Sequence, residues 1–227
     1  MTGTIVNAVA VIIGGLIGLL LKKGLPEKFS SAIMTGIALC TMYIGISGCL
    51  KGENPLITVI SIAVGAVIGT LLDLDGRLSA LGVAVEKRFK KKEGEKTPIA
   101  QGFISASLLF CVGAMAIMGA LESGLTNSHQ TLFTKSVMDF ISSIVFASSM
   151  GVGVLFSSIA VFIYQGIITL LSSFLSPILS ASAVAEMTCT GSLLLIGLGL
   201  NLLGVTKIKI MNYIPAIFIP ILLCTFM

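Results

Sequence analysis

Histidine, tryptophan and charge are scarce in this sequence. It has one histidine, His129, no tryptophan, and charged side chains at only 11% of its positions. A soluble domain carries charge on roughly a quarter of its residues, so the composition excludes an ordinary soluble protein. One histidine gives little material for a catalytic triad or a histidine-based metal site, and the sequence contains no phosphate-binding loop motif. We therefore expect no enzyme, no cofactor and no metal.

Clustered cysteine is missing as well. The five cysteines stand singly within or at the edges of apolar runs, without a pair at metal-ligand spacing. We interpret them as small buried hydrophobic residues.

Long apolar runs dominate instead, because hydrophobic residues make up 56% of the chain. A run of about 18 or more such residues can cross a bilayer as a helix, and a helix satisfies its own backbone hydrogen bonds in lipid. The sequence therefore predicts an all-α polytopic membrane protein of about eight transmembrane helices, surrounded by the lipid bilayer. The predicted spans are Thr4–Leu21, Ser31–Cys49, Leu56–Leu72, Ala100–Leu121, Val137–Met150, Val154–Phe174, Ala185–Gly204 and Ile210–Phe226.

Lysine and arginine set the predicted orientation, because they concentrate in cytoplasmic loops. Placing loop 76–99 in the cytoplasm leaves only Lys51 and Lys135 outside, and it puts both termini on the extracytoplasmic side. The basic cluster EKRFKKKEGEK, Glu86–Lys96, contains a single aromatic residue, Phe89. Because a nucleic-acid site needs more stacking partners, we interpret the cluster as a topology determinant on an anionic leaflet and expect no nucleic-acid partner.

The segment Val137–Met150 is short for a span that needs about 20 residues, and Gly151 and Gly153 lie where it should turn. A fused helix with the next segment would be far too long and would move Lys207 and Lys209 outside. The sequence therefore predicts either two spans here or a re-entrant hairpin followed by a span.

An internal repeat is predicted from two pairs of similar stretches. NAVAVIIGGLIGLLL (Asn7–Leu21) aligns with SIAVFIYQGIITLLS (Ser158–Ser172), and TGIAL (Thr35–Leu39) aligns with TGSLL (Thr190–Leu194). Spans one to three and six to eight would then form an inverted repeat, an arrangement that in many secondary transporters places the site between the repeats. The single membrane domain would divide into a first repeat (1–75), a basic cytoplasmic loop (76–99), a central broken-helix hairpin (100–153) and a second repeat (154–227).

Polar groups within spans need an explanation, because they usually face a bundle interior or a water-filled path. Asp139 lies four residues after Lys135, on one helical face. The two side chains could form an ion pair that steadies the start of the helix, or Asp139 could bind an ion or solute with the serines that follow. Glu186 could likewise bind a solute or cap its helix. The predicted binding residues are Asp139, Ser142, Ser143, Glu186, Thr190, Asn7, Gln165 and Asn201.

Glycine and proline interrupt several of the predicted spans. A proline removes an intrahelical hydrogen bond, and broken helices within a membrane are tolerated where they are buried or line water. The predicted helix-break residues are Gly113, Gly119, Gly151, Gly153, Pro215 and Pro220. Closely spaced glycines elsewhere, Gly14, Gly15 and Gly18 among them, indicate packing seams between helices, and such faces make a homodimer plausible.

The stretches LLFCVGAMAIMGALESGL and TLFTKSVMDFISSIVFASSMGVGVLFSS resemble a bacterial membrane family catalogued as domain of unknown function 554. YQGIITLL, TGSLLLIGLGLNLLG and TIVNAVAVIIGGLIG fit the same pattern, so the resemblance covers nearly the whole chain. It implies a multi-pass protein of the bacterial cytoplasmic (inner) membrane and transport as the function, but it brings no substrate residues.

The function that these observations favour is transport or conduction of a small cation or zwitterionic solute, coupled to protons or sodium. The alternative is a non-transporting assembly or regulatory protein whose glycines serve helix packing alone. On the first hypothesis Asp139 faces the interior near the repeat interface, and Asp139→Asn should leave folding largely intact while it removes activity.

Overall fold

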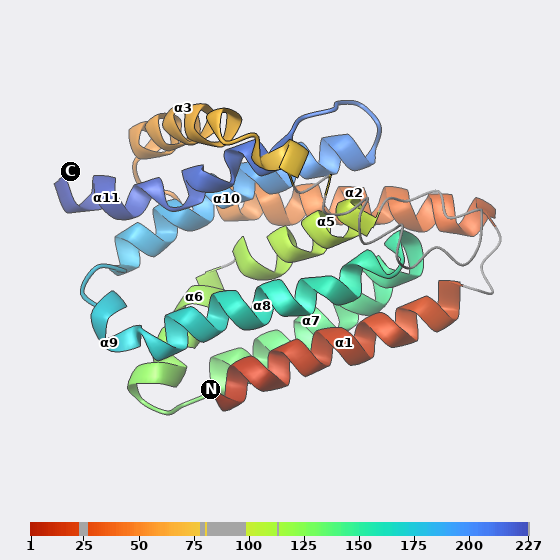
Figure 1. The fold of residues 1–227 in the computed structure, drawn as a ribbon, viewed down its shortest axis with the longest axis horizontal. Helices are drawn as coiled ribbons and strands as arrows, with labels where there is room; N and C mark the ends of the chain where they lie inside the picture. The colour runs from red at the N-terminus through yellow and green to blue at the C-terminus, as the bar shows by residue number, and fades with distance from the viewer. Residues whose placement is uncertain (23–26, 78–79, 81–98, 113, 227) are drawn as a thin grey trace.

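The computed structural model describes residues 1–22, 27–77, 80, 99–112 and 114–226, and helices with their connecting turns account for these ranges without a strand. The all-α prediction is confirmed. In chain order the elements are α1 (Thr2–Lys22), α2 (Glu27–Cys49), α3 (Pro55–Leu71), α5 (Ile99–Val112), α6 (Ala114–Leu125), α7 (Gln130–Met150), α8 (Gly153–Leu170), α9 (Ser172–Leu175), α10 (Ala181–Leu202), the 3-10 helix η1 (Ile210–Ile217) and α11 (Ile219–Phe226) (Figure 1).

The helices form two groups that lie side by side. In the first, α1 packs against α7 and α8, and α5 and α6 pack against α8 (Figure 1). In the second, α10 packs against α2 and η1, and α3 covers η1 and α11. Contacts of α10 with α5 and α6, and of α2 with α7, join the two groups.

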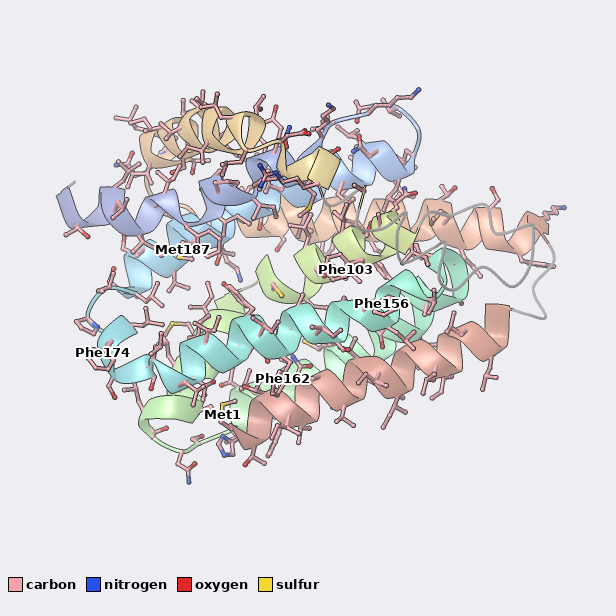
Figure 2. All side chains as sticks on the ribbon, viewed as in Figure 1. Met1, Phe103, Phe156, Phe162, Phe174 and Met187 are labelled. Carbon is pink, nitrogen blue, oxygen red and sulfur yellow. The ribbon has the colours of Figure 1, made fainter. Side chains whose placement is uncertain are left out.

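Burial differs strongly between the helices. In the most apolar stretch of α10, 72% of the residues are buried, against 28% in α2 and 39% in α1. The exposed side of α1 carries isoleucine, valine and leucine, and Figure 2 shows its side chains projecting outward along the edge of the molecule. An apolar outer surface around a buried central helix is what a lipid environment requires, so the structure supports a membrane location.

Local sequence explains several helix ends. Asn54 precedes α3, its side chain accepts a hydrogen bond from Leu56 N at 3.1 Å, and Pro55 occupies the first helical position. Ser180 caps α10 in the same way by accepting from Ala183 N at 3.1 Å. Gly151 ends α7 with a φ of 77°, a backbone conformation that glycine adopts without strain.

The predicted eight spans are reproduced only in part. Among the described residues four helices, α1, α2, α8 and α10, are long and apolar enough to cross a membrane, or five spans if the bent pair α5–α6 counts as one. Helix α3 and the segment Ile210–Thr225 are apolar but shorter. The span predicted over Val154–Phe174 ends at Leu170, because the chain turns there into the short α9.

The helix that contains the predicted fifth span starts before Val137. Helix α7 begins at Gln130 and runs for 21 residues, which at about 1.5 Å per residue gives a length of roughly 31 Å, the thickness of a bilayer core. Its first two turns are polar, so the apolar run in the sequence begins later than the helix does. The helix is long enough to cross, yet it is too polar to qualify by composition.

The predicted helix breaks have different outcomes. The break at Gly151 and Gly153 is present, since α7 ends and α8 begins there. Gly119 lies inside the continuous helix α6, where it contacts Thr131 and Leu132 of α7, so its role is close packing and not a break. Pro215 lies inside the 3-10 helix η1 and Pro220 in the first turn of α11.

The predicted break at Gly113 and the predicted basic loop concern residues that the structure does not describe. Gly113 and most of the basic loop, residues 78–79 and 81–98, lie outside the described residues. The helices on either side of Gly113, Ile99–Cys111 and Met115–Leu125, differ in direction by 60°.

Candidate functional site

A buried ion pair lies on α7 in the first group of helices. Lys135 Nζ lies 2.6 Å from Asp139 Oδ2, and the two side chains are 7% and 8% exposed. The i, i+4 spacing places both groups on one face of the helix. Burial of charged groups is costly unless they are paired and hydrogen-bonded, so this pair requires the polar surroundings described next.

Two amide side chains complete a buried polar cluster with the ion pair. Asn7 of α1 donates from Nδ2 to Asp139 Oδ2 at 3.0 Å and to Gln165 Oε1 of α8 at 3.3 Å. Asn7 and Gln165 are both fully buried. Reversing either amide would bring two donors or two acceptors together, so these contacts fix both orientations. We call Asn7, Lys135, Asp139 and Gln165 the polar cluster.

The polar cluster has unused hydrogen-bonding capacity. Asn7 Oδ1 and Gln165 Nε2 are buried and have no hydrogen-bond partner among the described residues. One is an acceptor and the other a donor, and an unpaired buried polar atom costs about 1–3 kcal/mol. A water or a solute that offers both a donor and an acceptor would satisfy them.

Small residues on α1 position the cluster by bringing α1 close to α7. An added Cβ at Gly14 would collide with Phe140 O, and one at Gly18 would collide with Ile144 O. Gly3 faces Leu132 in the same way. The close approach lets the short side chain of Asn7 reach α7, so the packing seam predicted from the glycine spacing also builds the site.

The cluster is closed along the helix axes. Toward the start of α1, Thr4 Oγ1 lies 3.4 Å from Thr169 Oγ1. In the other direction Val11, Val161 and Phe146 belong to one buried apolar core. Phe110 of the same core lies beneath Lys135, with its ring centroid 6.0 Å from Nζ, a distance at which a cation is attracted to an aromatic face.

The serines of α7 and α8 bond mainly to their own helices. Ser143 is buried and donates to Phe140 O at 2.8 Å, while Ser142 is half-buried beside it. Ser148, Ser157 and Ser158 donate to the carbonyls three residues earlier. These hydroxyl groups donate to backbone carbonyls of their own helices. The serines therefore act as small residues that permit close packing between helices.

Glu186 belongs to a different part of the fold. Its Oε1 accepts from the backbone N–H groups of Glu53 at 2.6 Å and Asn54 at 2.8 Å, and its Oε2 lies 3.4 Å from Thr58 Oγ1. The carboxylate therefore anchors the α2–α3 turn and stands at the N-terminus of α3, where negative charge is favourable. From the sequence, Glu186 could bind a solute or cap its own helix, α10. In the structure it accepts hydrogen bonds at the start of α3 instead.

The two remaining predicted residues also lie on α10. Asn201 donates from Nδ2 to Ile208 O at 2.7 Å and accepts at Oδ1 from Ile208 N and Thr206 Oγ1, which closes the turn before η1. Thr190 is fully buried, and its hydroxyl lacks a partner in the described part of the chain. The structure thus unites Asn7, Asp139 and Gln165 but leaves Glu186, Thr190 and Asn201 outside the polar cluster.

Three residues in or next to the polar cluster were not assigned to a site from the sequence. Lys135 was recognised as a partner of Asp139 but was assigned to the outer loop, whereas it is only 6% exposed. Thr4 and Thr169 carried no signal beyond their place in apolar runs. In the described ranges no group of three or more His, Cys, Asp or Glu side chains could hold a metal ion.

Comparisons with known proteins agree with the helical, apolar character of the chain. It is 30% identical to "Uncharacterized membrane protein YdfK" of Bacillus subtilis (strain 168), over 97% of this chain and 94% of that protein. It is 29% identical to "Uncharacterized protein YqgA" of Escherichia coli (strain K12), over 96% of this chain and 93% of that protein. No solved structure matches the chain. Residues 2–225 match the family described as "Protein of unknown function (DUF554)", and the chain belongs to that family.

Proposed function

We propose that the protein is an integral membrane transporter or ion-conducting protein for a small cation or zwitterionic solute, coupled to protons or sodium. The observation that carries the proposal is the polar cluster, which places two charges and two amides between three helices of a chain with only 11% charged residues. Ionisable groups within membrane spans commonly mark solute and ion pathways. The proposal needs neither catalysis nor a cofactor.

The composition of the polar cluster favours a zwitterion over a bare cation. Lys135 and Asp139 offer one charge of each sign, while Asn7 Oδ1 and Gln165 Nε2 offer a free acceptor and a free donor. A zwitterion could exchange its own ammonium and carboxylate for the ion pair without leaving a charge unpaired. A cation or proton at Asp139 would instead have to displace Lys135.

The proposed topology has eight spans with both termini extracytoplasmic and loop 76–99 in the cytoplasm of a bacterial inner membrane. Two features support it. Both chain termini lie on the left of the molecule in Figure 1, and α3 ends and α5 begins, next to loop 76–99, farther to the right, the direction in which α1 and α10 also end. Lys51 lies in the turn on the left, and Lys207 and Lys209 lie in the turn on the right, which agrees with the rule that cytoplasmic loops are basic.

An inverted repeat is part of the proposal. Each element of the first repeat contacts its expected counterpart: α1 packs against α8, α2 against α10, and α3 against η1. The members of each pair run in opposite directions along the molecule (Figure 1). Asn7 and Gln165 lie on the first of these pairs, so the polar cluster would occupy a repeat interface, where transporters of this design bind their solutes.

The test is a flux measurement in liposomes that contain the purified protein and a trapped pH-sensitive dye. A potassium gradient sets the membrane potential, and sodium chloride, neutral amino acids or betaines are then added one at a time. We expect at least one of them to drive proton movement or its own uptake above protein-free liposomes, and Lys135→Met/Asp139→Asn to abolish that flux. Lys51→Gln, at an exposed lysine outside the cluster, is the matched control.

The alternative function is a non-transporting assembly or regulatory protein with glycine-mediated packing, and a homodimer is compatible with either function. The described seam glycines are used inside the molecule, since Gly14 and Gly18 face α7 while Gly65 and Gly69 face η1. This leaves fewer of them for a partner and favours transport. Flux equal to protein-free liposomes for every solute tested would favour the alternative.

A further inference from the structure

A cavity lined in part by polar side chains lies close to where loop 76–99 follows the turn after α3 and precedes α5. It is separate from the polar cluster. It has a volume of about 250 Å³ and is lined by residues of the turn after α3, the start of α5, the end of α10 and the start of η1. The described residues that line it are Asp75, Ala100, Gln101, Ile104, Ser105, Leu198, Asn201, Ile208 and Ile210. At about 30 Å³ for each water in the liquid, the space suits a molecule of a few heavy atoms.

Ser105 indicates that the cavity holds a polar ligand. The residue is fully buried, and its hydroxyl has no hydrogen-bond partner among the residues that the structure describes, although it lines the cavity. A buried hydroxyl without a partner is unfavourable, and most buried polar groups in proteins are satisfied. A ligand or water in the cavity is therefore the natural partner of Ser105.

The walls of the cavity are held in place by other hydrogen bonds. The Asn201 amide is held by the turn before η1, where Nδ2 donates one hydrogen bond and Oδ1 accepts two. The backbone N–H of Asp75 donates to Asn212 Oδ1 at 2.9 Å, and Asp73 turns the chain with a positive φ of 45°. These contacts fix the Asn201 side chain, and the bond to Asn212 uses the backbone of Asp75 and not its carboxylate.

The charge and polarity of the walls define the chemical class of that ligand. Among the lining residues that the structure describes, Asp75 is the one charged side chain, and its carboxylate can pair with a cation. Ile104, Leu198 and Ile208 form an apolar side that suits an alkyl group. A single carboxylate gives a poor site for a divalent metal, which prefers several oxygen ligands.

We propose that this cavity is a binding site for a small alkylammonium compound. The ammonium group pairs with Asp75, the hydrogen-bonding part of the ligand meets Ser105 and Gln101, and the alkyl part contacts the isoleucine and leucine side chains. The site is distinct from the polar cluster, because it is built from α3, α5 and α10 instead of α1, α7 and α8. It does not depend on the transport function proposed above.

The experiment uses two thiol reagents of similar size and opposite charge on the full-length Ser105→Cys protein in detergent. The cationic reagent, trimethylammonium-ethyl methanethiosulfonate, is itself an alkylammonium compound, and sulfonato-ethyl methanethiosulfonate is its anionic counterpart. Mass spectrometry reads the modification at position 105. After correction for the reactivity of a free thiol, we expect the cationic reagent to react about tenfold faster, as electrostatic focusing in a charged cavity allows.

Adding Asp75→Asn to the Ser105→Cys protein should reduce the ratio of cationic to anionic reaction rates to about one. Butylammonium chloride should protect position 105 from the cationic reagent, whereas sodium acetate should not. Gln101→Cys provides a second position if Ser105→Cys fails to fold, with the same expected preference. Equal rates for the two reagents, faster reaction of the anionic reagent, or no modification at either position would overturn the proposal. None of these outcomes bears on the flux measurement.

Discussion

Asn7 of α1 donates from Nδ2 to Asp139 of α7 over 3.0 Å, a contact between helices whose residues are 132 positions apart in the sequence. The same nitrogen lies 3.3 Å from Gln165 Oε1 on α8. One amide therefore holds three helices together at the level of the ion pair. A change in charge at Asp139 would therefore alter a hydrogen bond of the amide that also contacts α8.

The first prediction concerns the stability of the ion pair. Asp139→Asn would leave Lys135 buried without its partner, and breaking a buried pair in this way costs about 3–5 kcal/mol. The double variant Lys135→Met/Asp139→Asn removes both charges and should recover most of that loss. Thermal unfolding in detergent measures the difference. Equal unfolding temperatures for wild-type protein and Asp139→Asn would show that water reaches Lys135.

This prediction revises the expectation from sequence that Asp139→Asn alone leaves folding largely intact. The sequence showed the i, i+4 spacing of Lys135 and Asp139, but it could not show that Lys135 is buried. Its place before the apolar run suggested a loop at the membrane surface. Only the packing of Phe110 and α1 around α7 reveals the burial, because those contacts come from distant parts of the chain.

The predicted binding residues that lie together in the polar cluster share one physical property. Asn7, Asp139 and Gln165 stand in otherwise apolar helical stretches, where a polar group must face the interior. Glu186 and Asn201 stand near the ends of α10 instead, and there backbone groups of neighbouring turns compete for them. Sequence cannot distinguish a ligand contact from a turn contact at a helix end, since both require the same donors and acceptors.

A second prediction tests the seam between α1 and α7. Gly14→Ala would push a Cβ into Phe140 O, a backbone atom that cannot move alone, so we expect a loss of about 2–3 kcal/mol or more. Gly36→Ala on α2 is the matched control, because an added Cβ there meets no described atom within 4 Å. Alanine at position 36 should be neutral or stabilise by up to about 1 kcal/mol. Unfolding temperatures of the two variants provide the comparison.

A third prediction separates the role of Glu186 from that of the polar cluster. Glu186→Ala removes the acceptor for the N–H groups of Glu53 and Asn54, which should cost about 1–3 kcal/mol and speed hydrogen exchange at both amides. Glu186→Gln keeps one acceptor oxygen and should lose less. Both variants should retain flux in liposomes once folded protein is normalised. If Glu186→Gln lost flux while hydrogen exchange at the amides of Glu53 and Asn54 stayed unchanged, the prediction would be wrong and Glu186 would belong to the transport path.

A fourth prediction concerns Gln165 and the hydrogen bonds of the cluster. Gln165→Leu removes the unpaired donor Nε2 together with the acceptor of Asn7. If a solute binds there, flux should fall much more than stability does, because an apolar side chain fills the space at a small energetic cost. The double-mutant cycle with Asn7→Leu should show coupling of about 0.5–3 kcal/mol in stability, as expected for residues in one network. Additive effects would mean that the two amides act separately.

The last prediction concerns the orientation of the chain in the membrane. Lys51 and Lys207 are both exposed and lie in turns at opposite ends of the molecule (Figure 1). In intact cells a membrane-impermeant maleimide should modify Lys51→Cys, whereas Lys207→Cys should react only after permeabilisation. Wild-type protein provides the background from native cysteines, among which Cys40 is exposed. Reaction of both variants from the same side would contradict the eight-span topology, because in that topology five crossings, by α3, α5–α6, α7, α8 and α10, separate the two turns.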